Sequence, residues 1–142
     1  MSWTVEYSDD LQIVILTYEG RVSGEDIKKA AAARIDMGRQ KGVTKFLVDT
    51  KKVEADETAI IEIYDIPDKL YPEKHAQITD QIAMIRPYSS TSRKMVKFFE
   101  DTCVNRGCYM MTFQNRESAI NWLQQSTSQS PSSDRLSEPP EE

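Results

Sequence analysis

The chain has 142 residues, a hydrophobic content of 39% and a formal net charge of −5 at pH 7. This length fits one domain with a single core, and the acidic balance argues against a nucleic-acid-binding protein, which needs a basic face. No apolar run approaches the ~20 residues of a membrane-spanning helix, and no basic stretch followed by an apolar one opens the chain. We therefore expect a cytoplasmic domain without a secretory signal.

The first two predicted elements form a hairpin. Residues 3–7 alternate between apolar and polar side chains, which is typical of a strand with one face in water. Residues 8–10 (Ser-Asp-Asp) favour a turn. The run 11–18 is apolar on both alternating sets, which predicts a central strand buried on both faces. The first strand is then the antiparallel edge neighbour of the second.

The first predicted helix has both of its boundaries marked. It begins at Ser23, a residue type that caps helix N-termini, and Glu25 and Asp26 follow where the helix dipole favours acidic groups. Gly38 or Gly42 marks its end. The alanines of this helix indicate that it lies close to a sheet.

Further strands and helices alternate along the rest of the chain. Buried strands are predicted at residues 44–49, 81–86 and 109–113. A long helix opens at residues 87–90 and stops at Gly107, and a capped helix follows the last strand. The order ββαβαβαβα predicts an α/β fold with a five-stranded mixed sheet, an antiparallel first strand, four main helices and right-handed parallel crossovers.

The C-terminal segment differs from the rest in composition. Residues 126–142 are rich in Ser, Gln, Pro and Glu and contain one apolar residue, Leu136. Such a segment cannot offset the entropy lost on ordering. We therefore expect a domain over residues 1–125 and a disordered tail over 126–142.

Residues 56–71 predict a helix with an unusually wide apolar face. Pro67 should kink or end this helix, and a loop predicted at residues 51–56 would let it swing away from the sheet. The apolar face comprises Ile60, Ile63, Tyr64, Pro67, Leu70 and Tyr71, with Ile61 and Ile66 widening it. Such a face predicts a site for a hydrophobic or lipid-like ligand, peripheral contact with the inner membrane, or a homodimer contact. The alternative is that it only covers the sheet.

A second candidate site lies where the predicted strands end. In an open parallel sheet, ligands bind outside the carboxyl ends of the strands, and residues 86–94 are the richest in polar groups there. Arg86, Ser89, Ser90 and Arg93 at a helix N-terminus predict an anion site. The alternative is that a serine caps the helix and the arginines are solvated.

No set of residues predicts catalysis. His75 is the only histidine and has no nearby cysteine or paired carboxylate. Cys103 and Cys108 do not have metal-ligand spacing, and no phosphate loop, nucleophile elbow or zinc motif is present. We therefore predict a binding module without enzymatic activity, metal or cofactor.

Several short motifs carry a family resemblance over residues 2–124. They are Trp3-x-Val5-Glu6-Tyr7, Tyr18-Glu19-Gly20 to Ser23-x-Glu25-Asp26, Lys45-Phe46-Leu47-Val48-Asp49, Phe98-Phe99-Glu100 to Asn105-Arg106-Gly107, and Ala119, Trp122 and Leu123. In them the chain resembles the SpoIIAA-like, STAS-type family of small bacterial proteins. The resemblance implies a mixed sheet wound as a β-α superhelix, a fold shared by anti-sigma-factor antagonists and CRAL-TRIO lipid-binding proteins.

The resemblance also implies a second function. Anti-sigma antagonists carry a phosphorylated Ser or Thr, in an Asp-Ser-Ser/Thr-Gly type motif, at the start of the second helix. In this chain that place falls at residues 56–59, which makes Thr58 the implied phosphosite. Ala59 replaces the following small polar residue and no glycine follows, so the match is partial. The alternative to ligand binding is thus a STAS-like regulatory domain that binds a protein partner.

Overall fold

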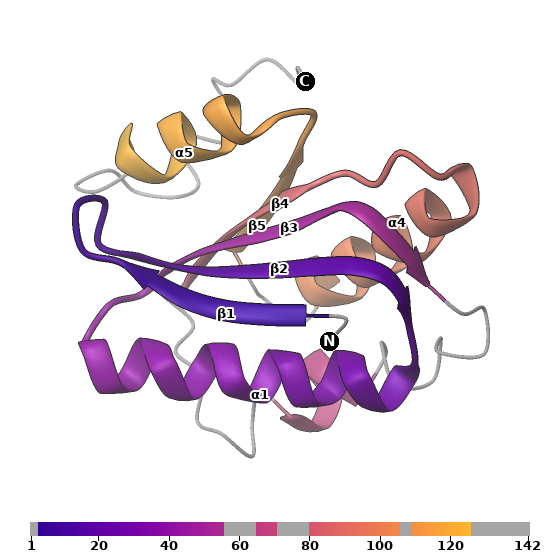
Figure 1. The fold of residues 1–142 in the computed structure, drawn as a ribbon, viewed down its shortest axis with the longest axis horizontal. Helices are drawn as coiled ribbons and strands as arrows, with labels where there is room; N and C mark the ends of the chain where they lie inside the picture. Colours follow the sequence, from indigo (N-terminus) through magenta and orange to yellow (C-terminus); the bar gives the residue numbers. More distant parts are fainter. Residues whose placement is uncertain (1–2, 56–64, 71–79, 106–108, 126–142) are drawn as a thin grey trace.

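A five-stranded sheet with the strand order β1-β2-β3-β4-β5 organises the fold (Figure 1). The computed structural model describes residues 3–55, 65–70, 80–105 and 109–125. β1 pairs with β2 in antiparallel fashion, and the other three strand pairs are parallel. The strands are β1 (Trp3–Ser8), β2 (Ile13–Val22), β3 (Lys45–Ala55), β4 (Gln81–Ile85) and β5 (Tyr109–Phe113). The predicted mixed sheet and its antiparallel first strand are confirmed.

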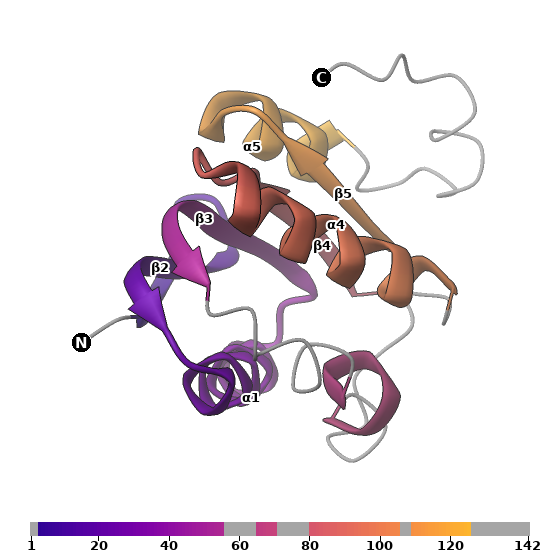
Figure 2. The same cartoon turned by 90° about the vertical axis from the view of Figure 1, so that its right-hand side faces the viewer.

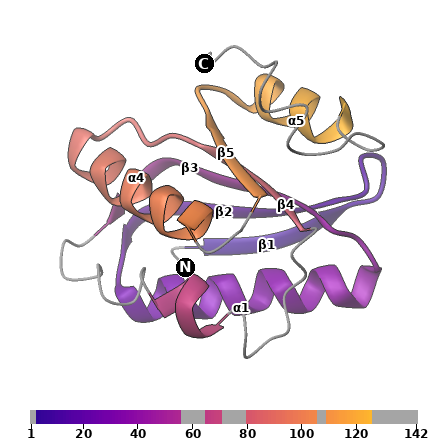
Figure 3. The ribbon, with the colours of Figure 1, turned by 180° about the vertical axis from the view of Figure 1, so that it is seen from behind.

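Helical segments cover both faces of the sheet. They are α1 (Gly24–Lys41), η2 (Ile66–Leu70), α4 (Ser90–Asn105) and α5 (Arg116–Gln125). α1, η2 and α4 share one face, with η2 beside α1, whereas α5 packs on the opposite face (Figures 2 and 3). Right-handed crossovers between sequentially ordered parallel strands place their connecting helices on one face, and α5 follows the last strand.

The strands divide their apolar side chains between two cores because successive side chains point to opposite faces. The larger core, under α1 and α4, contains Val14, Leu16, Phe46, Val48, Ile82, Met84 and Met110. The smaller core, under α5, contains Ile13, Ile15, Leu47, Ala83, Ile85, Tyr109 and Phe113. The inner strands are therefore apolar at consecutive positions, as the run at residues 11–18 predicted.

α1 starts and ends at residues that suit its termini. The Ser23 side chain accepts a hydrogen bond from the Asp26 N–H (3.1 Å), and the Asp26 carboxylate accepts one from the Ser23 N–H (3.4 Å). The helix ends at Gly42, whose φ of 71° is the left-handed conformation that glycine tolerates best. Gly38 remains inside the helix, where a Cβ atom would lie 2.6 Å from the Phe46 ring.

The loop predicted at residues 51–56 is wrong over residues 51–55, which continue β3. Lys52 pairs with Glu19 of β2, and Val53 is buried. The register of the two strands shifts between Thr17 and Glu19, beside Gly20 with its φ of 75°. Since residues 51–55 are held in the sheet, they are not the hinge that the sequence predicted.

The segment predicted as one helix over residues 56–71 is described only at 65–70. Within it, η2 is a π-helix, and Pro67 lies inside it without an N–H for a helical hydrogen bond. Ile66 is buried, and Leu70 is partly buried against the larger core. The other predicted residues that lie outside the described part are Thr58, Ala59, Ile60, Ile61, Ile63, Tyr64, Tyr71, His75, Arg106, Gly107, Cys108 and the tail 126–142.

Candidate functional sites

A polar pocket lies beyond the carboxyl ends of β4 and β5. Its described lining residues are Arg86, Tyr88, Arg93, Gln114 and Asn115, and its volume is about 300 Å³. The first two follow β4, Arg93 lies in the first turn of α4, and the two amides follow β5. The pocket thus lies at the edge of the sheet where the strand-end rule placed the predicted anion site.

Backbone carbonyl groups hold the two arginines of this pocket. The Arg93 Nε donates a hydrogen bond to the Pro87 carbonyl (2.8 Å). The Arg86 N–H donates to the Phe113 carbonyl (2.8 Å), and its guanidinium lies 3.5 Å from the Thr112 carbonyl. These contacts fix Arg93 to its own loop and Arg86 to the end of β5.

The two predicted serines are not among the residues that line the pocket. The Ser89 hydroxyl accepts a hydrogen bond from the Ser92 N–H (3.3 Å), and the Ser89 carbonyl accepts one from the Arg93 N–H (2.9 Å). Ser89 is therefore the N-cap of α4, which is the structural alternative that the sequence offered. Ser90 is the exposed first residue of α4. Of the four residues predicted as an anion site, the pocket brings together only Arg86 and Arg93.

A buried carboxylate lies within the neighbouring strand β3, level with the last residue of β4. The Asp49 side chain is 4% exposed, and its Oδ2 is 3.3 Å from the Arg116 guanidinium and 3.8 Å from Lys51 Nζ. Its Oδ1 accepts a hydrogen bond from the Lys51 N–H (3.1 Å). Arg116 is thus engaged in linking α5 to β3. By contrast, Arg93 forms no salt bridge with any described residue.

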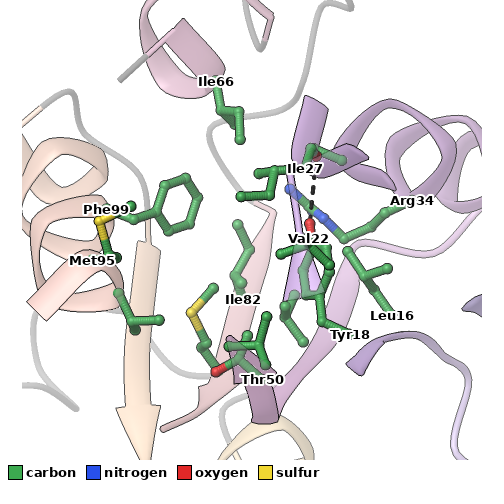
Figure 4. A pocket seen from close by; sticks show the side chains of 15 residues that line it. Leu16, Tyr18, Val22, Ile27, Arg34, Thr50, Ile66, Ile82, Met95 and Phe99 are labelled. Carbon is green, nitrogen blue, oxygen red and sulfur yellow. Dashed lines mark hydrogen bonds between the residues drawn. The ribbon is translucent and has the colours of Figure 1, made fainter. Parts of the chain in front are cut away.

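An apolar cavity lies on the face of the sheet that carries the larger core, between the strands and the helical segments α1, η2 and α4 (Figure 4). Its volume is about 70 Å³. The residues that line it come from several strands and all three of these helical segments: Leu16, Tyr18, Val22, Ile27, Ala31, Arg34, Val48, Thr50, Val53, Ile66, Ile82, Met84, Met95, Val96 and Phe99. Apart from Tyr18, Arg34 and Thr50, these side chains are apolar.

The polar groups around this cavity have protein partners. The Tyr18 hydroxyl donates a hydrogen bond to the Ile27 carbonyl (3.4 Å), and the Thr50 hydroxyl donates to the Ile85 carbonyl (Figure 4 labels Tyr18, Ile27 and Thr50). The Arg34 guanidinium carbon lies 4.9 Å from the centre of the Phe46 ring, a cation–π distance. Burial raises the pKa of the Tyr18 phenol, and the Arg34 charge opposes this only in part. The phenol therefore stays neutral at physiological pH.

The described end of the predicted apolar helix contributes to this cavity. Ile66 is 2% exposed and lines it, whereas Leu70 packs beside the same core. The sequence predicted Leu70 as part of the apolar binding face of this helix, and Ile66 only as a residue that widens that face. α1 contributes Ile27, Ala31 and Arg34 to the cavity, and the sequence did not predict this because a helix stripe does not reveal which strands it faces.

Two further tests apply to the described part of the chain. Its His, Cys, Asp and Glu side chains form no group of three or more that could hold a metal ion. None of its helices is both long enough and apolar enough to cross a bilayer. Cys103 is buried in the larger core.

Comparison with known proteins identifies the fold. The chain matches no protein-family model and no curated protein. It is similar to the anti-sigma factor antagonist SpoIIAA in its unphosphorylated form, with a TM-score of 0.52, 18% identity, and coverage of 86% of this chain and 97% of SpoIIAA. The phosphorylated form of the Bacillus cell fate determinant SpoIIAA gives a TM-score of 0.52 at 16% identity, covering 84% of this chain and 97% of that chain.

A third similar structure is an uncharacterised protein with a SpoIIAA-like fold from Shewanella loihica PV-4. Its TM-score is 0.53 at 16% identity, and the match covers 85% of this chain and 91% of that protein. At these identities the likeness concerns the fold, and the relation to CRAL-TRIO proteins stays a prediction. The mixed sheet, its strand order and these matches agree that the chain has a SpoIIAA-like, STAS-type fold.

Proposed function

We propose that this chain is a regulatory domain that acts by binding a protein partner and catalyses no reaction. The observation that supports this proposal is the match to an anti-sigma factor antagonist over 97% of that protein's length. A domain of this kind needs no convergent set of catalytic side chains, because its function lies in a contact surface. The sequence predicted this function as the alternative to ligand binding, and the structural match now favours it over ligand binding.

Thr58 offers a direct test of this proposal because the resemblance makes it the switch residue. The tagged chain would be isolated from its own cells, and native mass spectrometry would measure the bound protein and any 80-dalton increment. We expect a stoichiometric complex with one protein, which Thr58→Ala retains and Thr58→Glu loses. Ser118→Glu is the matched control, since Ser118 is exposed on α5 and the new charge there is favourable at a helix N-terminus.

Two outcomes would contradict this function. The chain would be recovered without a bound protein, or Thr58→Glu and Ser118→Glu would have the same effect on the complex. Recovery of the chain with a bound apolar molecule in place of a protein would favour the second function below.

The apolar cavity supports a second function, the binding of a small hydrophobic ligand. The cavity volume of about 70 Å³ limits the size of the ligand that it can hold. Pockets for drug-sized ligands measure about 300–1,000 Å³, and an engineered cavity of about 150 Å³ binds benzene. A lipid-like occupant therefore requires η2, which carries Ile66, to move away from the sheet. Membrane contact and a homodimer through residues 56–71 remain predictions.

A pair of alanines in α1 tests ligand binding in the cavity. Ala31 lines the cavity and is 4% exposed, whereas Ala33 is partly exposed and is not among the lining residues. We expect native mass spectrometry to detect an apolar small molecule on the purified chain. Ala31→Leu, which fills the cavity, should abolish its retention, and Ala33→Leu should not. Absence of such a mass from the parent chain would rule this function out.

A further inference from the structure

We infer that the polar pocket formed by Arg86, Tyr88, Arg93, Gln114 and Asn115 binds a small aromatic phosphate monoester. This inference is independent of the proposed function, because it concerns a different ligand in a pocket that shares no lining residue with the apolar cavity. Two arginines from separate segments, a loop and a helix, line the same pocket. The described lining contains no carboxylate, so the pocket carries concentrated positive charge on a chain with a net charge of −5.

The arginines are positioned in a way that suits an oxyanion. Arg93 uses Nε to bind the Pro87 carbonyl at 2.8 Å, so its planar guanidinium is fixed through one donor. Its two terminal nitrogens form no ion pair with a carboxylate of the described residues, and Arg86 lines the same pocket. Guanidinium groups bind phosphate through paired hydrogen bonds, and two of them favour a dianion over a monoanion.

The site does not depend on the N-terminus of α4 alone. The first-turn amide groups of Ser92 and Arg93 are already bonded to the Ser89 side chain and carbonyl. The cationic groups of the pocket are instead side chains from two segments. The pocket therefore differs from the anion site predicted from the sequence, which combined these two arginines with the serine hydroxyls and free amides of a helix N-terminus.

The remaining lining residues indicate an organic group attached to the phosphate. The pocket volume of about 300 Å³ lies at the lower end of the range for organic ligands. Tyr88 is 70% exposed and belongs to neither core, so packing does not explain a large aromatic residue there. Its ring can stack on a planar group, and the Gln114 and Asn115 amides supply hydrogen bonds. The Asn115 Oδ1 already accepts a hydrogen bond from the Ser118 N–H (2.8 Å), so the Asn115 NH₂ group is the part of this side chain that can donate a hydrogen bond to a ligand.

Three probes separate the components of this binding: phenyl phosphate, inorganic phosphate and phenol. Titrations would be followed by two-dimensional amide NMR on the full chain at fixed ionic strength. We expect phenyl phosphate to bind more tightly than inorganic phosphate, phenol not to bind, and the shifted amides to lie in residues 86–93 and 114–116. Arg86→Gln and Arg93→Gln should each weaken phenyl phosphate binding about tenfold, as expected for one charge-assisted contact.

Two further variants make the inference refutable. Lys94→Gln removes the same charge from an exposed neighbour outside the pocket and should leave binding unchanged. Tyr88→Ser should lower the affinity for phenyl phosphate to that for inorganic phosphate, and its exposure means that the fold is kept. The inference is overturned if Lys94→Gln weakens binding as much as Arg93→Gln does, which indicates general charge attraction. Equal binding of both phosphates, or shifts of amides elsewhere, overturns it as well.

Discussion

Gly38 provides the sharpest test of how α1 packs on the sheet. Replacing a glycine inside a helix by alanine normally stabilises the fold by about 1 kcal/mol. Here the added Cβ would lie 2.6 Å from Cζ and 2.7 Å from Cε1 of Phe46. The ring has little room to move, because Phe46 is 2% exposed and the Arg34 guanidinium lies over it. Overpacking of this kind costs about 1–3 kcal/mol, so we expect Gly38→Ala to lower the free energy of unfolding by about 1 kcal/mol.

Urea unfolding of four chains measures this effect: the parent, Gly38→Ala, Phe46→Leu and the double variant. Phe46→Leu alone should be destabilising, because it leaves space under α1. The methyl group that Gly38→Ala adds would then occupy part of that space, so the double variant should be at least about 1 kcal/mol more stable than additivity predicts. A stabilised Gly38→Ala chain, or strictly additive effects, would refute the close approach of α1 to β3.

Three further predictions concern other contacts of the fold. Asp49→Asn should lower the free energy of unfolding, measured in urea, by about 1–2 kcal/mol. This is less than the loss for a fully buried ion pair, because its partner Arg116 is 43% exposed, and Arg116→Gln should lower the free energy of unfolding by no more than Asp49→Asn does. Ser23→Ala removes the capping box shared with Asp26 and should cost about 1 kcal/mol in the same assay, whereas Ser23→Asn should cost much less. Burial raises the pKa of Tyr18 above the usual value of about 10, so the unfolded chain ionises first. This contribution to stability is therefore complete below pH ~10 and is lost as the pH rises further, so Tyr18→Phe should make the fall in stability above pH ~10 shallower.

The strands that the sequence predicted well are those with a clear apolar pattern. The strand at residues 109–113 has the predicted bounds, and β1 and β4 differ from prediction by one residue at an end. β3 was predicted to end six residues too early. Residues 51–54 (Lys-Lys-Val-Glu) are mostly charged and extend past the end of β4, and residues 52–54 pair with β2 alone. A half-exposed strand of that kind has too little apolar pattern to be distinguished from a loop.

The sequence predicted the position of the polar pocket better than that of the apolar cavity. The strand-end rule needs only strand order, and it predicted that Arg86 and Arg93 lie at one edge of the sheet, where they line the same pocket. The cavity combines residues far apart in sequence, such as Ala31 of α1 and Met95 of α4, and the sequence offers no rule that brings them together. The sequence also left Gly38 and Gly42 open as the end of α1. The helix ends at Gly42, and the close approach of Gly38 to the Phe46 ring, which favours a glycine inside the helix, is defined only by the packed structure.

α4 links the two candidate sites, which determines how they can be tested separately. Arg93 in its first turn lines the polar pocket, whereas Met95 and Phe99 further along the helix line the apolar cavity. The Ser92 hydroxyl also donates a hydrogen bond to the Val53 carbonyl (3.2 Å), which anchors this helix to β3. A substitution in the buried face of α4 would therefore disturb both sites at once. Changes at exposed Tyr88 and at Ala31 on α1 avoid α4, so loss of binding at one site can be assigned without a change at the other.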